Sequence, residues 1–356
     1  MKVNSTQIRF FAVIIALACF AFFAKGSHSN TRIGIISDVS YCGEREVALR
    51  IKIAAESLGW EVFVDEQRGR KVKKIRGLDW TICLLPNNKY YNKYCRNYVT
   101  LFHPFNYLNE QGKLDPFYER YDGYLLTIRS TESLKDLLSK KNRPFFSTPF
   151  YPTVHPVDYK LVVFNNLMTM IPVWGNRRTD DKFKQFYRML SQGGFTQFYG
   201  VHENKDMIEN GYMGSIPFDG TSVIETLQKH GIVLIFHSDI HNREAIPSSR
   251  IFEAAAASVA IISDTNEFVK NHFGDAVFYV DTSLSAEEIY QQVKRHVETI
   301  QQNPLMVLEM ARKCHQIFND RFLMTDQLMR IASMHNEVQK QRSARCKFHF
   351  GQFSLQ

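Results

Sequence analysis

The residues with the clearest potential for chemistry follow an apolar run at 232–237, which is typical of a buried strand. Ser248 and Ser249 then open a helix as candidate N-caps, and Glu253 lies about one turn inside it. A helix that begins at the carboxyl edge of a parallel sheet offers unpaired N–H groups and a partial positive charge to a phosphate. Glu253 is placed to reach a ribose hydroxyl. The spacing therefore predicts a nucleotide-diphosphate site without a glycine-rich loop.

Short apolar strands alternate with helices through both halves of the chain, which predicts βαβ units and parallel sheets. The expected strands of the first half are 32–37, 61–64, 81–85, 99–102 and 124–127, with helices at 44–58 and 132–139. The expected strands of the second half are 161–164, 171–174, 197–199, 232–237, 259–262 and 277–280. Its expected helices are 180–190, 221–229, 249–257, 266–272, 286–300, 304–318 and 325–341. The predicted fold class is α/β with two Rossmann-like domains.

The proline-rich stretch 144–158 holds too many prolines for a regular element and is predicted to be a hinge. It separates an expected N-terminal domain, 31–143, from a C-terminal domain, 159–322, and residues 323–356 are expected to form a final helix and tail. Residues 1–30 contain an apolar run flanked by positive charges. This leader is interpreted as a signal peptide or a membrane anchor, so we expect association with a membrane through it, on an undecided side.

Composition narrows the choice of partner. The chain has 356 residues, 44% of them hydrophobic, and a net charge of +8. That charge fits a nucleotide, a lipid headgroup or an acidic membrane face, and it is too diffuse to predict nucleic-acid binding. The six cysteines show no CxxC pair and no metal spacing with histidine, so no zinc site is expected.

The segment Gly231-Ile-Val-Leu-Ile-Phe-His-Ser, followed by Pro247-Ser-Ser-Arg-Ile-Phe-Glu-Ala and Ile261-Ile-Ser-Asp, resembles the donor-binding region of bacterial GT-B glycosyltransferases. The resemblance is to the CgeB-like, group 1 enzymes and spans about 173–322. It implies a GT-B architecture, ribose binding by Glu253, and diphosphate binding by Ser248 and Ser249. Many relatives carry a second glutamate eight positions earlier, where this chain has Ala245, so the resemblance leaves the donor-sugar contact unassigned.

Further donor contacts are expected at the same sheet edge. Arg250 stands in the first turn of the helix, and Arg177 and Arg178 follow Gly175 in a loop directly after a predicted strand. Gly175 would let the backbone approach the donor, and each arginine could pair with a phosphate; the alternatives are an exposed basic turn and a surface charge. His237 ends a strand and is expected to contact the nucleotide or sugar, unless it is a buried structural histidine.

The acceptor side is expected in the first domain. Asp38 and Gly43 lie in the loop after its first strand, where Gly43 allows close approach of chain and donor, and His103 follows a later strand. Either Asp38 or His103 is a candidate base for the acceptor hydroxyl, with capping and turn formation as the alternatives. No Asp-x-Asp motif is present. Asp180, beside Asp181, and Asp264, at the end of a predicted strand, are each expected to cap the helix that follows.

The preferred hypothesis is a metal-independent glycosyltransferase that moves a sugar from a nucleotide-diphosphate donor to a hydroxyl of a glycan, lipid or protein. No cofactor is expected, because the nucleotide sugar is a co-substrate. The alternative is a non-catalytic protein of GT-B type that binds a nucleotide or glycan. A dinucleotide oxidoreductase is disfavoured, because neither half carries Gly-x-Gly-x-x-Gly after its first strand.

Overall fold

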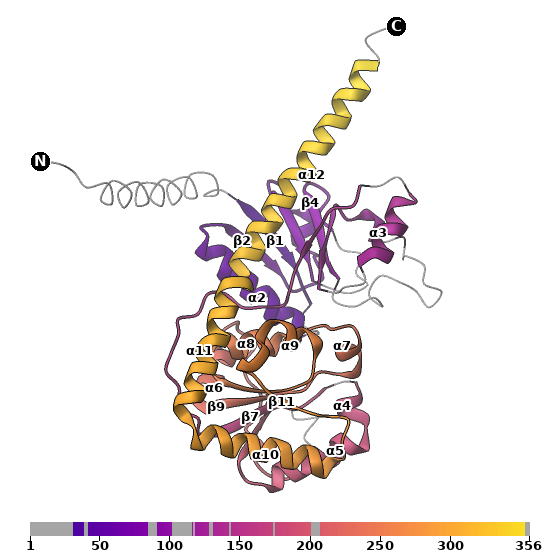
Figure 1. The fold of residues 1–356 in the computed structure, drawn as a ribbon. Helices are drawn as coiled ribbons and strands as arrows, with labels where there is room; N and C mark the ends of the chain where they lie inside the picture. The colour runs from indigo at the N-terminus through magenta and orange to yellow at the C-terminus, as the bar shows by residue number, and fades with distance from the viewer. Residues whose placement is uncertain are drawn as a thin grey trace, which may run out of the picture.

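The computed structural model describes residues 31–38, 42–84, 91–101, 116, 118–127, 131–141, 144–173, 175–200 and 207–352. These residues form two α/β domains, each built on a parallel sheet (Figure 1). The apolar leader at 1–30 and the candidate base His103 lie outside the described residues. None of the helices within the described ranges is long and apolar enough to cross a bilayer.

The N-terminal sheet has six parallel strands in the order β2-β1-β3-β4-β5-β6. Apolar residues dominate them, as is typical of strands covered on both faces. They are β1 (Arg32–Ile36), β2 (Glu61–Asp65), β3 (Trp80–Cys83), β4 (Arg96–Leu101), β5 (Gly123–Leu126) and β6 (Ser147–Pro149). The helices α2 (Cys42–Ser57) and α12 (Met324–Gln352) share one core cluster with this sheet, and α3 (Thr131–Ser139) shares the other.

The C-terminal sheet has five parallel strands in the order β11-β10-β9-β7-β8. They are β7 (Asn166–Met170), β8 (Thr196–Tyr199), β9 (Gly231–Ile235), β10 (Ala260–Asp264) and β11 (Phe278–Val280). One face packs against α6 (Ser222–His230), α8 (Ser249–Ala256), α9 (Glu267–Phe273) and α11 (Pro304–Arg321). The other packs against α5 (Asp181–Gln192) and α10 (Ala286–Gln302). The short helices α4 (Asn176–Thr179) and α7 (Asp239–Arg243) follow β7 and β9.

Two strands predicted at 161–164 and 171–174 are wrong, because the structure has the single strand β7 between them. Leu161 and Val163 satisfied the apolar pattern, yet they are 73% and 69% exposed. In the second segment Pro172 has no N–H to donate to a neighbouring strand. The buried residues of this region are those of β7 itself, of which Leu167 is fully covered.

The proline-rich stretch 144–158 is not wholly irregular. It contains β6, which pairs with β5 and completes the edge of the N-terminal sheet. Pro149 is tolerated there because β6 is an edge strand, where a missing N–H costs little. The last helix, α12, leaves the C-terminal domain and lies across the N-terminal one, where Leu328 and Ile331 are fully buried (Figure 1).

Candidate functional site

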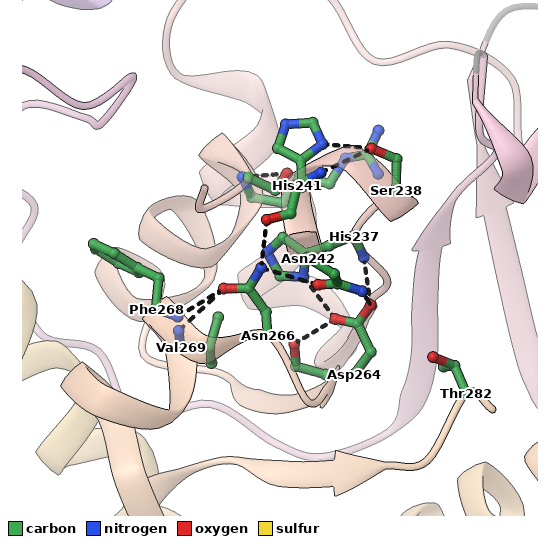
Figure 2. A network of polar contacts seen from close by, with 12 residues as sticks. His237, Ser238, His241, Asn242, Asp264, Asn266, Phe268, Val269 and Thr282 are labelled. Atoms are coloured by element: carbon green, nitrogen blue, oxygen red, sulfur yellow. Dashed lines mark hydrogen bonds and ion pairs between the residues drawn. The ribbon is translucent and has the colours of Figure 1, made fainter. Parts of the chain in front are cut away.

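The ends of two adjacent strands bring His237 and Asp264 together. β9 and β10 are parallel neighbours, so the residues that follow β9 meet the last residue of β10 at one sheet edge. The Asp264 carboxylate accepts the His237 backbone N–H at 2.9 Å and faces the imidazole Nδ1 at 2.6 Å (Figure 2). Both side chains are completely buried. These two contacts with Asp264 thus hold the His237 imidazole in one orientation.

Asp264 is the centre of a buried polar network. Its Oδ2 also accepts hydrogen bonds from Arg177 Nη2 at 3.0 Å and from Asn242 Nδ2 at 2.9 Å. Burial alone would raise the pKa of Asp264, but the nearby His237 and Arg177 side chains hold this pKa below its ordinary value. An ionised carboxylate is an acceptor only, so we infer that His237 Nδ1 carries the proton of their hydrogen bond. His237 Nε2 is buried and has no hydrogen-bond partner within the part of the chain that the structure describes.

Asn266 holds the loop before α8 in place. Its side-chain oxygen caps α9 by accepting the N–H groups of Phe268 and Val269. Its amide nitrogen donates to Asn242 Oδ1 at 3.0 Å and therefore links α9 to the Asp264 network (Figure 2). The expectation that Asp264 caps this helix is wrong, because Asn266 stands two residues closer to the helix and has the free amide oxygen. The capping role of Asp180 is confirmed.

A cavity of about 90 Å³ lies beside His237, and we call it the β9 cavity. It is lined by Thr169, Met170, Pro172, Val173, Arg177, Tyr187, Phe236, His237, Ser238, His241, Ser248 and Arg250. Ser248 is the N-cap of α8, as predicted, and its hydroxyl accepts the Arg250 N–H. The cavity therefore combines the start of a helix, an orphaned imidazole nitrogen and two guanidinium groups.

Arg250 is the cation of the β9 cavity that remains available. Its guanidinium is half-buried and forms neither an ion pair nor a hydrogen bond with any residue in the described ranges. Burial lowers the pKa of Arg250 while the Glu253 carboxylate opposes that change, and an arginine stays protonated in either case. Burial raises the pKa of neighbouring Tyr187 to about 12, so this phenol is neutral. A half-buried cation without a partner favours an anionic ligand.

The other predicted arginines and Gly175 have different surroundings. Arg177 donates Nε to the His237 carbonyl at 2.6 Å, and its guanidinium stacks over the Phe183 ring at 3.9 Å, so most of it supports the network. Arg178 is half-buried in α4. Gly175 has φ +76°, and a Cβ there would meet the Ser238 side chain at 3.3 Å. Glycine is therefore required where the loop after β7 approaches the loop after β9.

Glu253 lies at the contact between the two domains and does not line the β9 cavity. Its carboxylate pairs with Arg50 Nη2 of α2 at 2.8 Å. The same guanidinium nitrogen pairs with Glu46 at 2.9 Å, and Glu46 in turn accepts the Gly220 N–H at 3.1 Å. We call Glu46, Arg50 and Glu253 the domain clasp. The structure thus gives Glu253 a buried cationic partner in place of open space.

The acceptor-side candidates are not gathered at the β9 cavity. Asp38 is buried, and its carboxylate pairs with Arg68 Nε. Gly43 is exposed near the start of α2, where a Cβ would meet open space. Ser249 is half-buried in the first turn of α8. Among the residues the structure describes, no three His, Cys, Asp or Glu side chains are grouped as metal ligands.

The sequence prediction missed two residues of the Asp264 network and one of the domain clasp. Asn242 and Asn266 looked like ordinary loop residues, and only their contacts with Asp264 and with each other reveal their function. Arg50 had a detectable signal, because a Glu46–Arg50 pair at i,i+4 stands among the apolar residues of α2. A charge on the buried face of an amphipathic helix indicates a partner on another element.

Comparison with known proteins agrees with this architecture. Residues 184–333 match the model of a family described as glycosyl transferase-like. An α-glucosyltransferase in complex with UDP and an HMU-containing DNA aligns with a TM-score of 0.61 at 11% identity, covering 86% of this chain and 100% of that one. A glycosyltransferase from Rickettsia africae aligns with a TM-score of 0.50 at 12% identity, covering 87% and 99%. No curated protein sequence matches the chain significantly.

The fold is that of the GT-B glycosyltransferases, as the two parallel-sheet domains and the solved structures show together. The family match covers residues 184–333, which include β9, α8 and β10. The chain is thus similar to glycosyltransferases both in its fold and in the sequence of residues 184–333, and the predicted resemblance is confirmed.

Proposed function

We propose that the protein transfers a sugar from a nucleoside-diphosphate donor, bound at the β9 cavity, to an acceptor hydroxyl. The observation that supports it most directly is the Arg250 guanidinium at the N-terminus of α8, beside His237 Nε2, because neither group has a partner among the described residues. Arg250 and the first N–H groups of α8 would bind the diphosphate. His237 Nε2, which has no partner among the described residues, would form a hydrogen bond with a hydroxyl of the donor.

The same groups would supply the chemistry of transfer. Breaking the bond between sugar and phosphate leaves an extra negative charge on the nucleoside diphosphate. Fixed donors that point at this developing charge lower the barrier, and they cost no reorganisation at the moment of reaction. Arg250 and the start of α8 can do this without a metal ion, so metal independence is part of the proposal. Arg177 adds positive potential from behind His237.

Ribose binding by Glu253 remains a prediction within this proposal. Its Oε1 is 2.8 Å from Arg50, so a ribose hydroxyl would have to bind beside that pair or displace it. A substitution to alanine would leave Arg50 buried and unpaired, and would mix loss of binding with loss of stability. Glu253→Gln keeps the size and the hydrogen-bonding capacity of the side chain and is the better test of its contact with the nucleotide.

The structural relatives support a uridine nucleotide as the first donor to test. One α-glucosyltransferase structure contains UDP and DNA. A second α-glucosyltransferase structure, which aligns with this chain at a TM-score of 0.58, contains UDP-glucose and DNA. At 11% identity these complexes support the fold and do not transfer their DNA acceptor to this chain. The proposed acceptor is a glycan, lipid or protein hydroxyl.

The test is calorimetric titration of the soluble chain with UDP. Replacing Arg250 by Gln removes a charge-assisted contact worth about 1.5–3 kcal/mol, so UDP affinity should fall by about 10- to 100-fold. Arg243→Gln is the matched control, because Arg243 is exposed and pairs only with adjacent Glu244. Equal UDP affinity of the Arg250→Gln variant and the control would contradict the proposal.

The alternative of a non-catalytic nucleotide-binding protein has one specific observation in its favour. At the position of the second family glutamate the chain has Ala245, whose φ of +52° turns the loop without supplying a carboxylate. Release of UDP from UDP-glucose in the presence of candidate acceptors separates the two functions. Turnover supports the transferase, whereas tight UDP binding without turnover across donors would favour the binding protein.

A further inference from the structure

A second and larger cavity, of about 330 Å³, lies between the two domains, and we call it the interdomain cavity. The N-terminal domain contributes the ends of β5 and β6, including Ser147 and Thr148, and Tyr151 just beyond them. The C-terminal domain contributes Ala245 and one side of α9. Because the loop at 241–248 lines both cavities, the interdomain cavity lies next to the proposed donor site.

Several polar groups in the described lining of the interdomain cavity are neutral and available. The hydroxyls of Ser147 and Thr148 and the amide of Asn271 form no hydrogen bond with any described side chain or backbone group. His272 Nδ1 is buried and also has no partner. Burial lowers the pKa of His272, and the Arg321 cation lowers it further, so this imidazole is neutral at pH 7. Among the described lining residues none carries a formal charge.

Aromatic rings are part of the lining of the interdomain cavity. Tyr151 and Phe268 have ring centroids 5.3 Å apart, and the His272 ring lies over Phe268 at 4.3 Å. A sugar ring has apolar C–H faces and a rim of hydroxyl groups. It therefore fits a site that combines ring surfaces with several neutral donors and acceptors.

We propose that the interdomain cavity binds the acceptor, and that this acceptor is a neutral carbohydrate. This inference rests on the proposed transferase function and specifies its acceptor. An anionic acceptor, such as a phosphate-bearing lipid or a nucleic acid, would need cations to replace the water that it loses on binding. The described lining offers hydroxyl, amide and neutral imidazole groups instead of cations. Among the glycan, lipid and protein hydroxyls proposed above, this inference selects the hydroxyl of a neutral glycan.

The experiment uses a matched pair of probes: the p-nitrophenyl glucoside and glucuronide, with the galactose pair as a second series. Each pair differs only by a carboxylate, so it reports the charge preference of the site. Binding is followed by ligand-observed NMR with UDP present. We expect the neutral glycosides to bind and the uronides to bind at least about tenfold more weakly, which corresponds to about 1.4 kcal/mol.

The variant that tests the location is Asn271→Trp, which places a large ring in the cavity from an exposed position on α9. Lys270→Trp is its matched control, because Lys270 is exposed on the same helix and does not line the cavity. Ser147→Trp, from the exposed side of β6, provides a second blocking variant. We expect both blocking variants to weaken glycoside binding by at least about tenfold, equal to about 1.4 kcal/mol, and the control to bind like the wild type.

Several results would overturn the proposal. Absence of neutral-glycoside binding, equal or tighter binding of the uronides, or indifference to both blocking variants would each do so. An increase in the KM for the donor, with glycoside affinity unchanged, would assign the cavity to the sugar of the donor. Failure of the wild type to bind UDP is a separate result, because it would refute the proposed function at the β9 cavity.

Discussion

The domain clasp gives the sharpest prediction about stability. Arg50 is 1% exposed and lies between two buried carboxylates, Glu46 and Glu253, from different domains. Arg50→Gln would leave both carboxylates buried without their shared cation. Breaking a buried ion pair from one side costs about 3–5 kcal/mol, because the remaining charge is unpaired in a medium of low dielectric. We expect the free energy of unfolding to fall by about this amount.

The measurement is urea unfolding of the variant followed by tryptophan fluorescence, because Trp60 and Trp80 are buried in the same core cluster as α2. Lys52→Gln is the control on the same helix. Lys52 and Glu56 are 43% and 51% exposed, and their charges are 3.8 Å apart, so losing this pair should cost less than about 1 kcal/mol. A third variant, with Gln at 46, 50 and 253 together, should recover most of the loss.

The pH dependence adds an independent check. Burial raises the pKa of Glu46 even though Arg50 opposes the change, and loss of Arg50 would raise this pKa further. A carboxyl whose pKa is higher in the folded state than in the unfolded state takes up its proton first in the folded state as the pH falls. The stability deficit of Arg50→Gln should therefore narrow between pH 7 and 5. A deficit no larger than that of Lys52→Gln, or one that widens with acid, would refute the reasoning.

Two further predictions concern buried histidines. Asp264→Asn would remove the charge that fixes His237, and we expect UDP affinity and the free energy of unfolding both to fall, the latter by about 3 kcal/mol; unchanged UDP binding on calorimetry would contradict this role. The Nδ1 atom of His335 in α12 is hydrogen-bonded to the Tyr98 hydroxyl at 2.8 Å, and burial lowers the pKa of His335 from 6.5. As the pH falls, the imidazole of His335 therefore takes up a proton more readily in the unfolded state than in the folded state. The free energy of unfolding should drop as the pH falls below about 6.5. His335→Gln should flatten this drop in thermal melts, and an identical slope in both proteins would contradict the assignment.

Local signals in the sequence predicted the elements around the candidate site well. The apolar run of β9, the Ser248 cap and the helix that follows depend on neighbouring residues, and the structure confirms all three. The strand before Gly175 was misplaced, because a count of apolar residues cannot separate the exposed Leu161 and Val163 from buried β7. The pattern of apolar residues alone could not show which of these segments are buried.

Contacts between residues far apart in the sequence could not be predicted from local patterns. The pairing of Arg50 with Glu253 joins residues 203 positions apart in sequence, and no spacing rule connects them. The same holds for Asp264, whose position at a strand end suggested a helix cap, whereas its partners come from the loops after β7 and β9. The candidate site could be located from the sequence, but the network that orients it could not.

The path of α12 has a consequence for how the chain folds during its synthesis. Met324, Leu328 and Ile331 are fully buried in the same core as β1 and α2, although nearly the whole chain separates them. The first sheet to leave the ribosome therefore cannot fully cover the face that it shares with α2 until α12 has emerged. Domains commonly mature in the order of their synthesis. Here the C-terminal sheet can complete its core first, and the earlier-made half must wait with apolar surface open to chaperones.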